Sequence, residues 1–98
     1  MDLDAKRRKR LRGLAHALEP VVHVGKGLLT DELAAQVERA LEAHELIKIR
    51  FVAGKEAKRE LAAELARRTG AAAAGVVGNV AILYRAHPEA SRRKVRLD

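Results

Sequence analysis

The chain has 98 residues, which suits one small domain, and 48% of them are hydrophobic, so it can build a core. It has no cysteine, which excludes disulfides, thiolate metal sites and thiol nucleophiles, and no apolar run approaches the ~18 residues of a membrane span. The formal net charge is +7 and the N-terminus lacks the apolar segment of a signal peptide, so we expect a cytoplasmic protein that binds a polyanion.

The positive charge is concentrated at the two ends of the chain. Residues 1–12 hold six Lys or Arg against two Asp, residues 92–98 hold four against one Asp, and residues 13–91 are balanced at ten of each sign. Solubility alone does not need such dense clusters, which are typical of nucleic-acid binding. We therefore predict that nucleic acid contacts Lys6, Arg7, Arg8, Lys9, Arg10 and Arg12 at one end and Arg92, Arg93, Lys94 and Arg96 at the other.

The first predicted helix covers residues 4–18. Its apolar positions follow helical spacing and form one stripe, made of Leu11, Leu14, Ala15 and Leu18. Pro20 ends the helix, because the residue before a proline avoids the helical region. The basic residues occupy the first turns, where the helix dipole disfavours them, which indicates that their charge serves binding.

A valine-rich strand is predicted at residues 21–24, followed by the loop Gly25-Lys26-Gly27-Leu28 and by a second helix over residues 30–44 that Thr30 caps. A helix N-terminus presents unpaired N–H groups and the positive end of the dipole, so this loop predicts a phosphate contact. The simpler alternative is an ordinary strand-to-helix turn in which the glycines supply positive φ. The full P-loop pattern is missing, which argues against nucleotide hydrolysis.

The second half of the chain begins with a strand over residues 45–53, in which Lys48 and Arg50 alternate with apolar residues. These two cations either touch RNA or form the solvated side of the strand, and we favour the second interpretation because alternation alone explains them. A third helix follows over residues 55–69. The turn signal Gly78-Asn79 then predicts a hairpin of two strands, 73–77 and 80–85.

The order of elements is therefore α-β-α-β-α-β-β. It predicts an α/β fold, namely a two-layer sandwich with a four-stranded mixed sheet and helices packed against it. We expect residues 1–86 to form this domain and residues 87–98 to be a basic C-terminal tail that is extended or mobile. One core is expected between the sheet and the helices, formed by Leu14, Val37, Leu41, Ile49, Leu61, Leu65 and Ile82.

No catalytic or metal-binding pattern is visible, because the four histidines lack zinc spacing and no carboxylate pair stands out. We expect no enzyme activity, no cofactor, no metal and no small-molecule substrate. Phe51 and Tyr84 are the only aromatic residues, too few for a base-stacking platform, so contacts to phosphate and ribose are expected. Two alternatives remain open: a nonspecific DNA binder, and a membrane-surface protein that uses its basic N-terminal helix.

Several segments between residues 11 and 85 together resemble the YhbY family, the bacterial stand-alone form of the CRM (chloroplast RNA splicing and ribosome maturation) domain. They are Leu11-Arg12-Gly13-Leu14-Ala15-His16, Pro20-Val21-Val22-His23-Val24-Gly25-Lys26, Ala40-Leu41-Glu42-Ala43-His44-Glu45-Leu46-Ile47-Lys48-Ile49, Thr69-Gly70-Ala71 and Leu83-Tyr84-Arg85. The resemblance implies an RNA-binding domain similar in fold to the C-terminal domain of bacterial translation initiation factor three. It also implies association with precursors of the large ribosomal subunit and their rRNA, and we expect a monomer.

The resemblance also implies that the loop is a GxxG loop, similar to the backbone-clamping loop of KH domains. Here the loop departs from that pattern, because Leu28 stands at its last position and a glycine, Gly27, stands one place earlier. Leu28 is either a core anchor at the entry to the second helix or an exposed contact that replaces the family's glycine. We favour the anchor, since Leu28-Leu29 resembles a hydrophobic helix entry.

Overall fold

The computed structural model describes residues 3–97 and contains three α-helices and four strands in the predicted order. They are α1 (Ala5–Ala15), β1 (Val22–Val24), α2 (Asp31–His44), β2 (Leu46–Phe51), α3 (Lys58–Thr69), β3 (Ala72–Val77) and β4 (Val80–Tyr84). Two short 3-10 helices, η1 (Lys55–Ala57) and η2 (Ala90–Arg92), precede α3 and follow β4. The first helix ends three residues earlier than the apolar stripe predicted.

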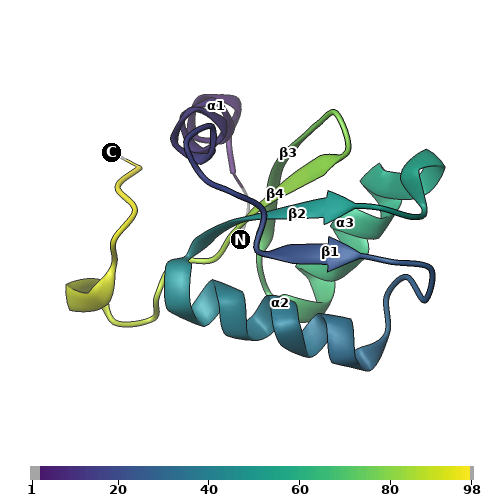
Figure 1. The fold of residues 1–98 in the computed structure, drawn as a ribbon. Helices are drawn as coiled ribbons and strands as arrows, with labels where there is room; N and C mark the ends of the chain where they lie inside the picture. Colours follow the sequence, from purple (N-terminus) through teal and green to yellow (C-terminus); the bar gives the residue numbers. More distant parts are fainter. Residues whose placement is uncertain (1–2, 98) are drawn as a thin grey trace.

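The four strands form one mixed sheet in the order β1-β2-β4-β3, so the α/β fold with a four-stranded mixed sheet is confirmed. β1 runs parallel to β2, with Val22 opposite Ile49, and β4 runs antiparallel to both of its neighbours. The last strand thus lies in the middle of the sheet (Figure 1). The pairing of β3 with β4 shifts register between Ala73 and Gly75.

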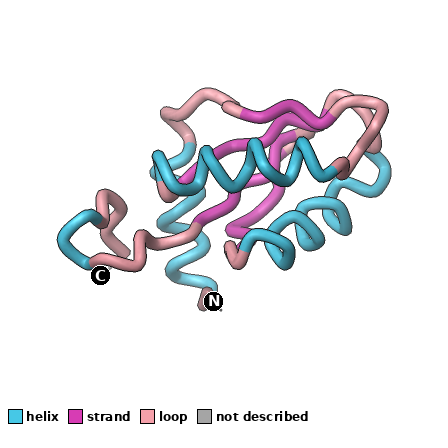
Figure 2. The backbone as a smooth tube through the Cα atoms, turned by 90° about the horizontal axis from the view of Figure 1, so that it is seen from below, coloured by secondary structure: helices cyan, strands magenta, loops and turns pink. Residues whose placement is uncertain are grey.

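The main core lies between one face of the sheet and the helices α2 and α3. Alternate residues of β2 point into it, and α2 contributes a stripe at helical spacing formed by Leu33, Val37 and Leu41. The hydroxyl oxygen of Thr30 accepts a hydrogen bond from the backbone N–H of Leu33 at 3.0 Å, so Thr30 is the N-cap of α2 as predicted. Figure 2 shows α2 lying across the strands.

A second core lies on the opposite face, where α1 packs. Leu11 and Ala15 of α1 meet Leu46, Ile82 and Tyr84 there. The strands β2 and β4 carry apolar residues on both faces. Both faces of the sheet must therefore be covered, which requires a layer of helix on each side. The sheet therefore lies between two helical layers rather than under one (Figure 1).

Two members of the predicted single core change place for this reason. Ile82 faces α1, away from α2 and α3. Leu14 belongs to neither buried cluster and is 40% exposed. Of the predicted apolar stripe, only Leu11 and Ala15 are buried against the sheet. The helix ends at Ala15, so Leu18 lies in the irregular linker that follows.

The segment after β4, expected to be an extended or mobile tail, contacts the body of the protein. Its backbone turns through η2 and returns toward α1, and Val95 and Leu97 pack against the second core. The basic residues of this segment therefore have defined positions relative to those of α1.

Candidate nucleic-acid interface

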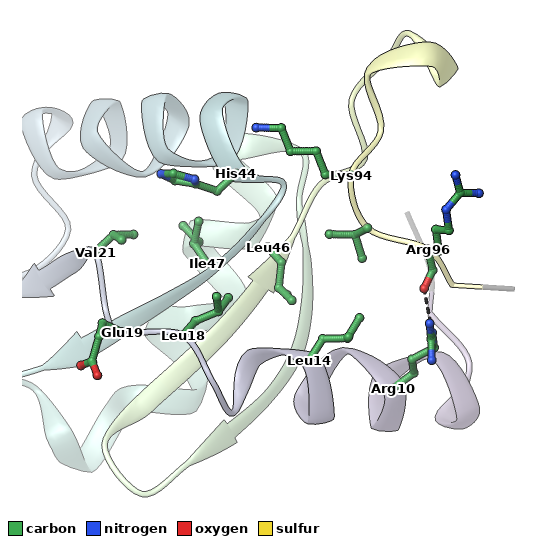
Figure 3. Close-up of a pocket in the computed structure, with 11 residues that line it drawn as sticks. Arg10, Leu14, Leu18, Glu19, Val21, His44, Leu46, Ile47, Lys94 and Arg96 are labelled. Atoms are coloured by element: carbon green, nitrogen blue, oxygen red, sulfur yellow. Dashed lines mark hydrogen bonds between the residues drawn. The ribbon is translucent and has the colours of Figure 1, made fainter.

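Basic side chains from the two ends of the chain meet on the α1 side of the sheet. The Arg10 Nε donates a hydrogen bond to the carbonyl oxygen of Arg96 at 2.7 Å, which joins α1 to the C-terminal segment (Figure 3). Arg7, Arg93 and Arg96 lie around one depression beside Tyr84. We call the basic side chains of residues 6–12 and 92–96 the terminal cluster. The two basic ends of the chain are thus adjacent in space.

Some members of the terminal cluster also hold the structure together. The Arg12 Nη1 donates to the carbonyl oxygen of Ala74 at 3.0 Å, and its aliphatic stem crosses Gly75 so closely that a Cβ there would lie 2.8 Å from its Cδ. The Arg8 guanidinium donates to the carbonyl oxygen of Leu3. Both residues are half-buried. Arg12 attaches α1 to β3 and Arg8 holds the segment before α1, whereas Lys6, Arg7 and Lys9 are exposed. The exposed residues are the better candidates for phosphate contact.

The C-terminal basic residues have contacts of their own. The Arg92 Nε lies 3.2 Å from a carboxylate oxygen of Glu89, and both side chains are largely exposed. The Arg93 Nε donates to the carbonyl oxygen of His87 at 2.8 Å. The Lys94 Nζ donates to the carbonyl oxygen of Ala43 at 3.2 Å. Such exposed contacts contribute little to stability, so these cations remain available to a polyanion.

Glu45 organises the C-terminal segment, and the sequence interpretation missed it. Its side chain is only 2% exposed, and its carboxylate accepts hydrogen bonds from three backbone N–H groups, those of His87, Lys94 and Val95. Its own backbone is in the left-handed region, with φ at +61°. Glycine or asparagine usually fills such a position after a helix, so the hydrogen bonds of the carboxylate offset the cost of a glutamate there.

The ionisation of Glu45 follows from these contacts. Burial alone raises the pKa of its carboxyl, but the backbone N–H groups of His87, Lys94 and Val95, together with the nearby His87 side chain, favour the ionised form. The net effect is a pKa below the ordinary value of 4.5. At neutral pH the tail is therefore held by a buried carboxylate rather than by a neutral acid.

The loop Gly25–Leu28 lies between β1 and the first turn of α2, and Lys26 in it is exposed. It is closed by hydrogen bonds from the Leu28 N–H to the Gly25 carbonyl oxygen at 3.0 Å and from the Thr30 N–H to the Leu28 carbonyl oxygen at 3.1 Å. The first turn of α2 also carries Asp31 and Glu32. Their charges compete with an anion for the positive end of the helix dipole.

Positive φ in this loop occurs at Leu28, at +55°, and at neither Gly25 nor Gly27. The alternative in which these two glycines supply positive φ is thus wrong, and the last loop position is the one where a glycine would be unstrained. Leu28 is 36% exposed, and its methyl ends lie over Gly54 beside Leu61. The side chain therefore anchors the loop on the turn that follows β2.

The loop and the terminal cluster lie at opposite ends of the sheet (Figure 1). The parallel pair β1 and β2 connects the two ends, since Leu46 begins β2 near the C-terminal segment and Phe51 ends it beside Val24. At about 3.3 Å per residue, β2 alone separates them by roughly 17 Å. The residues predicted to bind RNA thus form two separate groups, the loop and the terminal cluster.

Polar residues of the sheet lie on the same face as α1, between these groups. Strand alternation places Lys48 and Arg50 on that face, with His23 opposite Arg50 in the neighbouring strand. The Lys48 Nζ donates to the carbonyl oxygen of Leu18 at 2.9 Å and so holds the linker after α1. Arg50 and His23 are exposed. The face that α1 leaves uncovered is therefore polar and basic.

No helix within residues 3–97 has the length and apolar character needed to cross a bilayer. Within the same range, no three side chains of His, Asp or Glu come together in a way that could hold a metal ion.

Comparison with known proteins gives consistent matches along the chain. The model of the CRS1 / YhbY (CRM) domain matches residues 3–85. An "RNA-binding protein" of Haemophilus influenzae is 40% identical over 89 residues, which are 90% of this chain and 90% of that protein. The "Probable RNA-binding protein YqeI" of Bacillus subtilis is 35% identical over 88 residues, 89% of this chain and 92% of that protein. The solution structure of the hypothetical protein SAV1595 from Staphylococcus aureus superimposes with a TM-score of 0.82 at 30% identity, covering 97% of this chain and 100% of that one.

Proposed function

The chain belongs to the CRS1 / YhbY (CRM) domain family, and on this premise we propose that it is a cytoplasmic RNA-binding protein. We further propose that it associates with the rRNA of precursor large ribosomal subunits and assists their assembly. Its action is binding without chemical turnover. The names of two relatives, which describe RNA-binding proteins, support the first part of the proposal.

The observation that carries the proposal is the meeting of the two basic ends of the chain. Residues 1–12 and 92–98 carry the whole net charge of +7, because residues 13–91 are balanced, and the Arg10–Arg96 hydrogen bond brings the two ends together on the α1 side of the sheet. The exposed residues Lys6, Arg7 and Lys9 add to this surface. A concentrated positive surface attracts RNA phosphates and releases their counterions.

The recognition mode follows from where the aromatic residues lie. Phe51 is 1% exposed and Tyr84 is 3% exposed, so neither ring offers a free face for base stacking. Contacts from arginine and lysine to phosphate oxygens, and from the loop backbone to the sugar–phosphate chain, fit this surface better than a stacking platform. We therefore infer recognition by charge and shape with weak sequence preference.

The first experiment measures RNA affinity against salt concentration, with an in vitro transcript of large-subunit rRNA as the probe. The variant Lys6→Gln/Lys9→Gln removes two exposed charges of the terminal cluster. Each lost phosphate contact should reduce the slope of log affinity against log salt by about 0.7 to 0.9. The fold should be intact, because both side chains are exposed.

A matched control removes two exposed arginines from the opposite helical layer, with the substitutions Arg39→Gln and Arg59→Gln on α2 and α3. It changes the net charge by the same amount but leaves the terminal cluster intact. Equal slopes for the two double variants would reject the terminal cluster as the RNA-binding surface. Equal competition by duplex DNA would instead favour a general nucleic-acid binder.

The ribosomal part of the proposal needs a test in cells. Ultraviolet crosslinking of the tagged protein, followed by sequencing of the bound RNA, should enrich large-subunit rRNA and its unprocessed flanks. The protein should also sediment with immature large subunits and be depleted from mature ribosomes. Crosslinks spread over messenger RNA in proportion to abundance would contradict the assignment while leaving RNA binding in place.

A further inference from the structure

An open apolar groove lies where α1, the linker after it and the C-terminal segment meet the sheet. Its volume is about 630 Å³, within the range of pockets that hold small organic groups. The buried residue Leu46 lies at its floor, with Leu14 and Leu18 around it (Figure 3), and Ile47 and Val95 also line it. We call it the tail groove. Nothing in the proposed phosphate contacts accounts for its apolar lining.

The apolar side chains of the tail groove are unusually accessible. Leu14 is 40% exposed, Leu18 is 38% exposed and Val21 is 49% exposed, and all three line the same groove. Single exposed leucines are common on protein surfaces, whereas a contiguous apolar patch with polar edges marks a binding site.

The rim of the tail groove carries the same cations that we assign to RNA. Arg10 comes from α1, while Lys94 and Arg96 come from the C-terminal segment, and Glu19 is the acidic residue among those that line it. Arg10 and Arg96 meet at one end of the groove, and Lys94 lies farther along its rim beside His44 (Figure 3). A phosphodiester chain that passes from the Arg10–Arg96 pair to Lys94 would follow the opening of the groove. This geometry places the base of an intervening nucleotide over an apolar floor.

We propose that the tail groove receives an unpaired nucleobase of the bound RNA while Arg10, Lys94 and Arg96 hold the flanking phosphates. This inference rests on the proposed RNA binding and adds one base contact to it. RNA-binding proteins recognise single-stranded loops and bulges through splayed bases, whose flat faces are largely apolar. The two aromatic rings are buried and cannot stack on a base. Leucine and valine side chains can still provide van der Waals contact with its face.

Charge decides against the main rival, an acidic amphipathic helix of a protein partner. Such a helix would match the cations of the rim but would bring its carboxylates close to Glu19. An RNA strand instead has its charge only on the backbone, which the rim faces, and presents an uncharged base to the groove. The cations also continue from the groove along α1 to Lys6 and Lys9, as a longer RNA backbone requires.

The test compares two RNA hairpins with the same stem, one with an unpaired cytidine loop and one whose loop residues are abasic. Phosphates and ribose are equal in the two probes, so any difference in affinity comes from the bases. The wild-type protein should bind the cytidine loop at least about fivefold more tightly, because only that loop offers a base whose apolar face can be buried on the groove.

Variants of the groove should remove only this difference. Leu14→Asn and Leu18→Asn make the walls polar without changing the charge, and both positions are partly exposed, so the fold should tolerate them. Each variant should bind the cytidine loop less tightly and the abasic loop as well as the wild type does. The matched control is Val77→Asn, an exposed valine near the β3–β4 turn at the other end of the sheet, which should retain the full difference.

The outcomes separate the two proposals. Binding of both hairpins with equal affinity would overturn the base-binding groove and leave RNA binding standing. Binding of neither hairpin, nor of rRNA, would overturn both. Groove-dependent binding of a glutamate- and leucine-rich amphipathic peptide, with no discrimination between the hairpins, would assign the groove to a protein partner and overturn this inference.

Discussion

Glu45 is the residue on which the position of the C-terminal basic segment depends. Its carboxylate satisfies three backbone N–H groups of that segment, and hydrogen bonds to a charged group contribute about 1.5 to 3 kcal/mol each when one partner is lost. Glu45→Gln keeps the size of the side chain but replaces one acceptor oxygen by a donor. We expect a loss of about 1 to 3 kcal/mol in unfolding free energy and a weaker contribution of Lys94 and Arg96 to RNA affinity. Chemical denaturation and binding titrations check the two effects.

The same residue predicts a pH dependence. The folded pKa of Glu45 lies below its ordinary value of 4.5, so the unfolded chain binds the proton more readily. The stabilisation is therefore present above pH ~4.5 and is lost as the pH falls through the folded pKa. Melting curves between pH 3 and 7 should show a drop in Tm below ~4.5 that is smaller in Glu45→Gln. Identical pH profiles of the variant and the wild type would show that Glu45 does not hold the segment in its ionised form.

Leu28 combines a strained backbone with a useful side chain. A leucine at φ +55° costs about 1 kcal/mol relative to glycine, while its methyl ends pack over Gly54 and beside Leu61. Leu28→Ala loses the packing and keeps most of the strain, whereas Leu28→Gly loses the packing and relieves the strain. We expect the alanine variant to be less stable than the glycine variant by about 1 kcal/mol in urea unfolding. A glycine variant that is the less stable of the two would mean that relief of strain at φ +55° is smaller than the backbone entropy that a glycine loses on folding.

At the residue scale, the hydrogen bonds of a side chain could be predicted from the sequence only where the partner lies a few residues away. Thr30 is recognisable as a helix cap because its partner is three residues away. The partners of Glu45 are 42 to 50 residues away, so no local pattern reveals them. Arg12 was predicted for RNA because it belongs to a basic run, yet it reaches Ala74 across 62 residues.

At the scale of elements, hydrophobic periodicity located the helices and strands well but did not assign α1 to a face of the sheet. Periodicity shows that α1 has an apolar side. It does not show which face of the sheet α1 covers, because that depends on the path of the linker from Ala15 to Val22. The adjacent apolar pairs Leu46-Ile47 and Ile82-Leu83 were the signal that both faces of the sheet are buried.

A matched pair of leucines tests this arrangement. Leu41 on α2 is 1% exposed in the main core, and Leu14 on α1 is 40% exposed at the tail groove. Leu41→Ala should therefore lower the unfolding free energy by about 2 to 5 kcal/mol, whereas Leu14→Ala should lower it by less than about 1 kcal/mol. Both values come from equilibrium denaturation. Similar losses at the two positions would mean that α1 buries its Leu14 side against the sheet.

At the scale of the whole molecule, the basic surface is divided. The molecule measures 37 × 23 × 23 Å, and the loop with Lys26 lies at the opposite end of the sheet from the terminal cluster (Figure 1). The sequence revealed the charge of each segment but not its distance from the others, because that distance depends on how the sheet orders its strands. A single RNA that touches both groups must extend along the sheet, across the face that holds Arg50 and His23.

This division predicts how charge variants combine. Lys26→Gln removes the loop cation and Lys6→Gln/Lys9→Gln removes two cations of the terminal cluster, and neither change alters a contact of the other. Losses of binding free energy at sites more than 7 to 10 Å apart add within about 0.5 kcal/mol, so the triple variant should show the sum on a long structured rRNA. On a hairpin too short to reach both ends, only one of the two changes should lower the affinity.

Affinity measurements of the four proteins, wild type included, on both RNAs give the comparison. A triple variant no weaker than the worse of its parents on the long RNA would show that the loop and the terminal cluster bind alternative sites rather than one extended RNA.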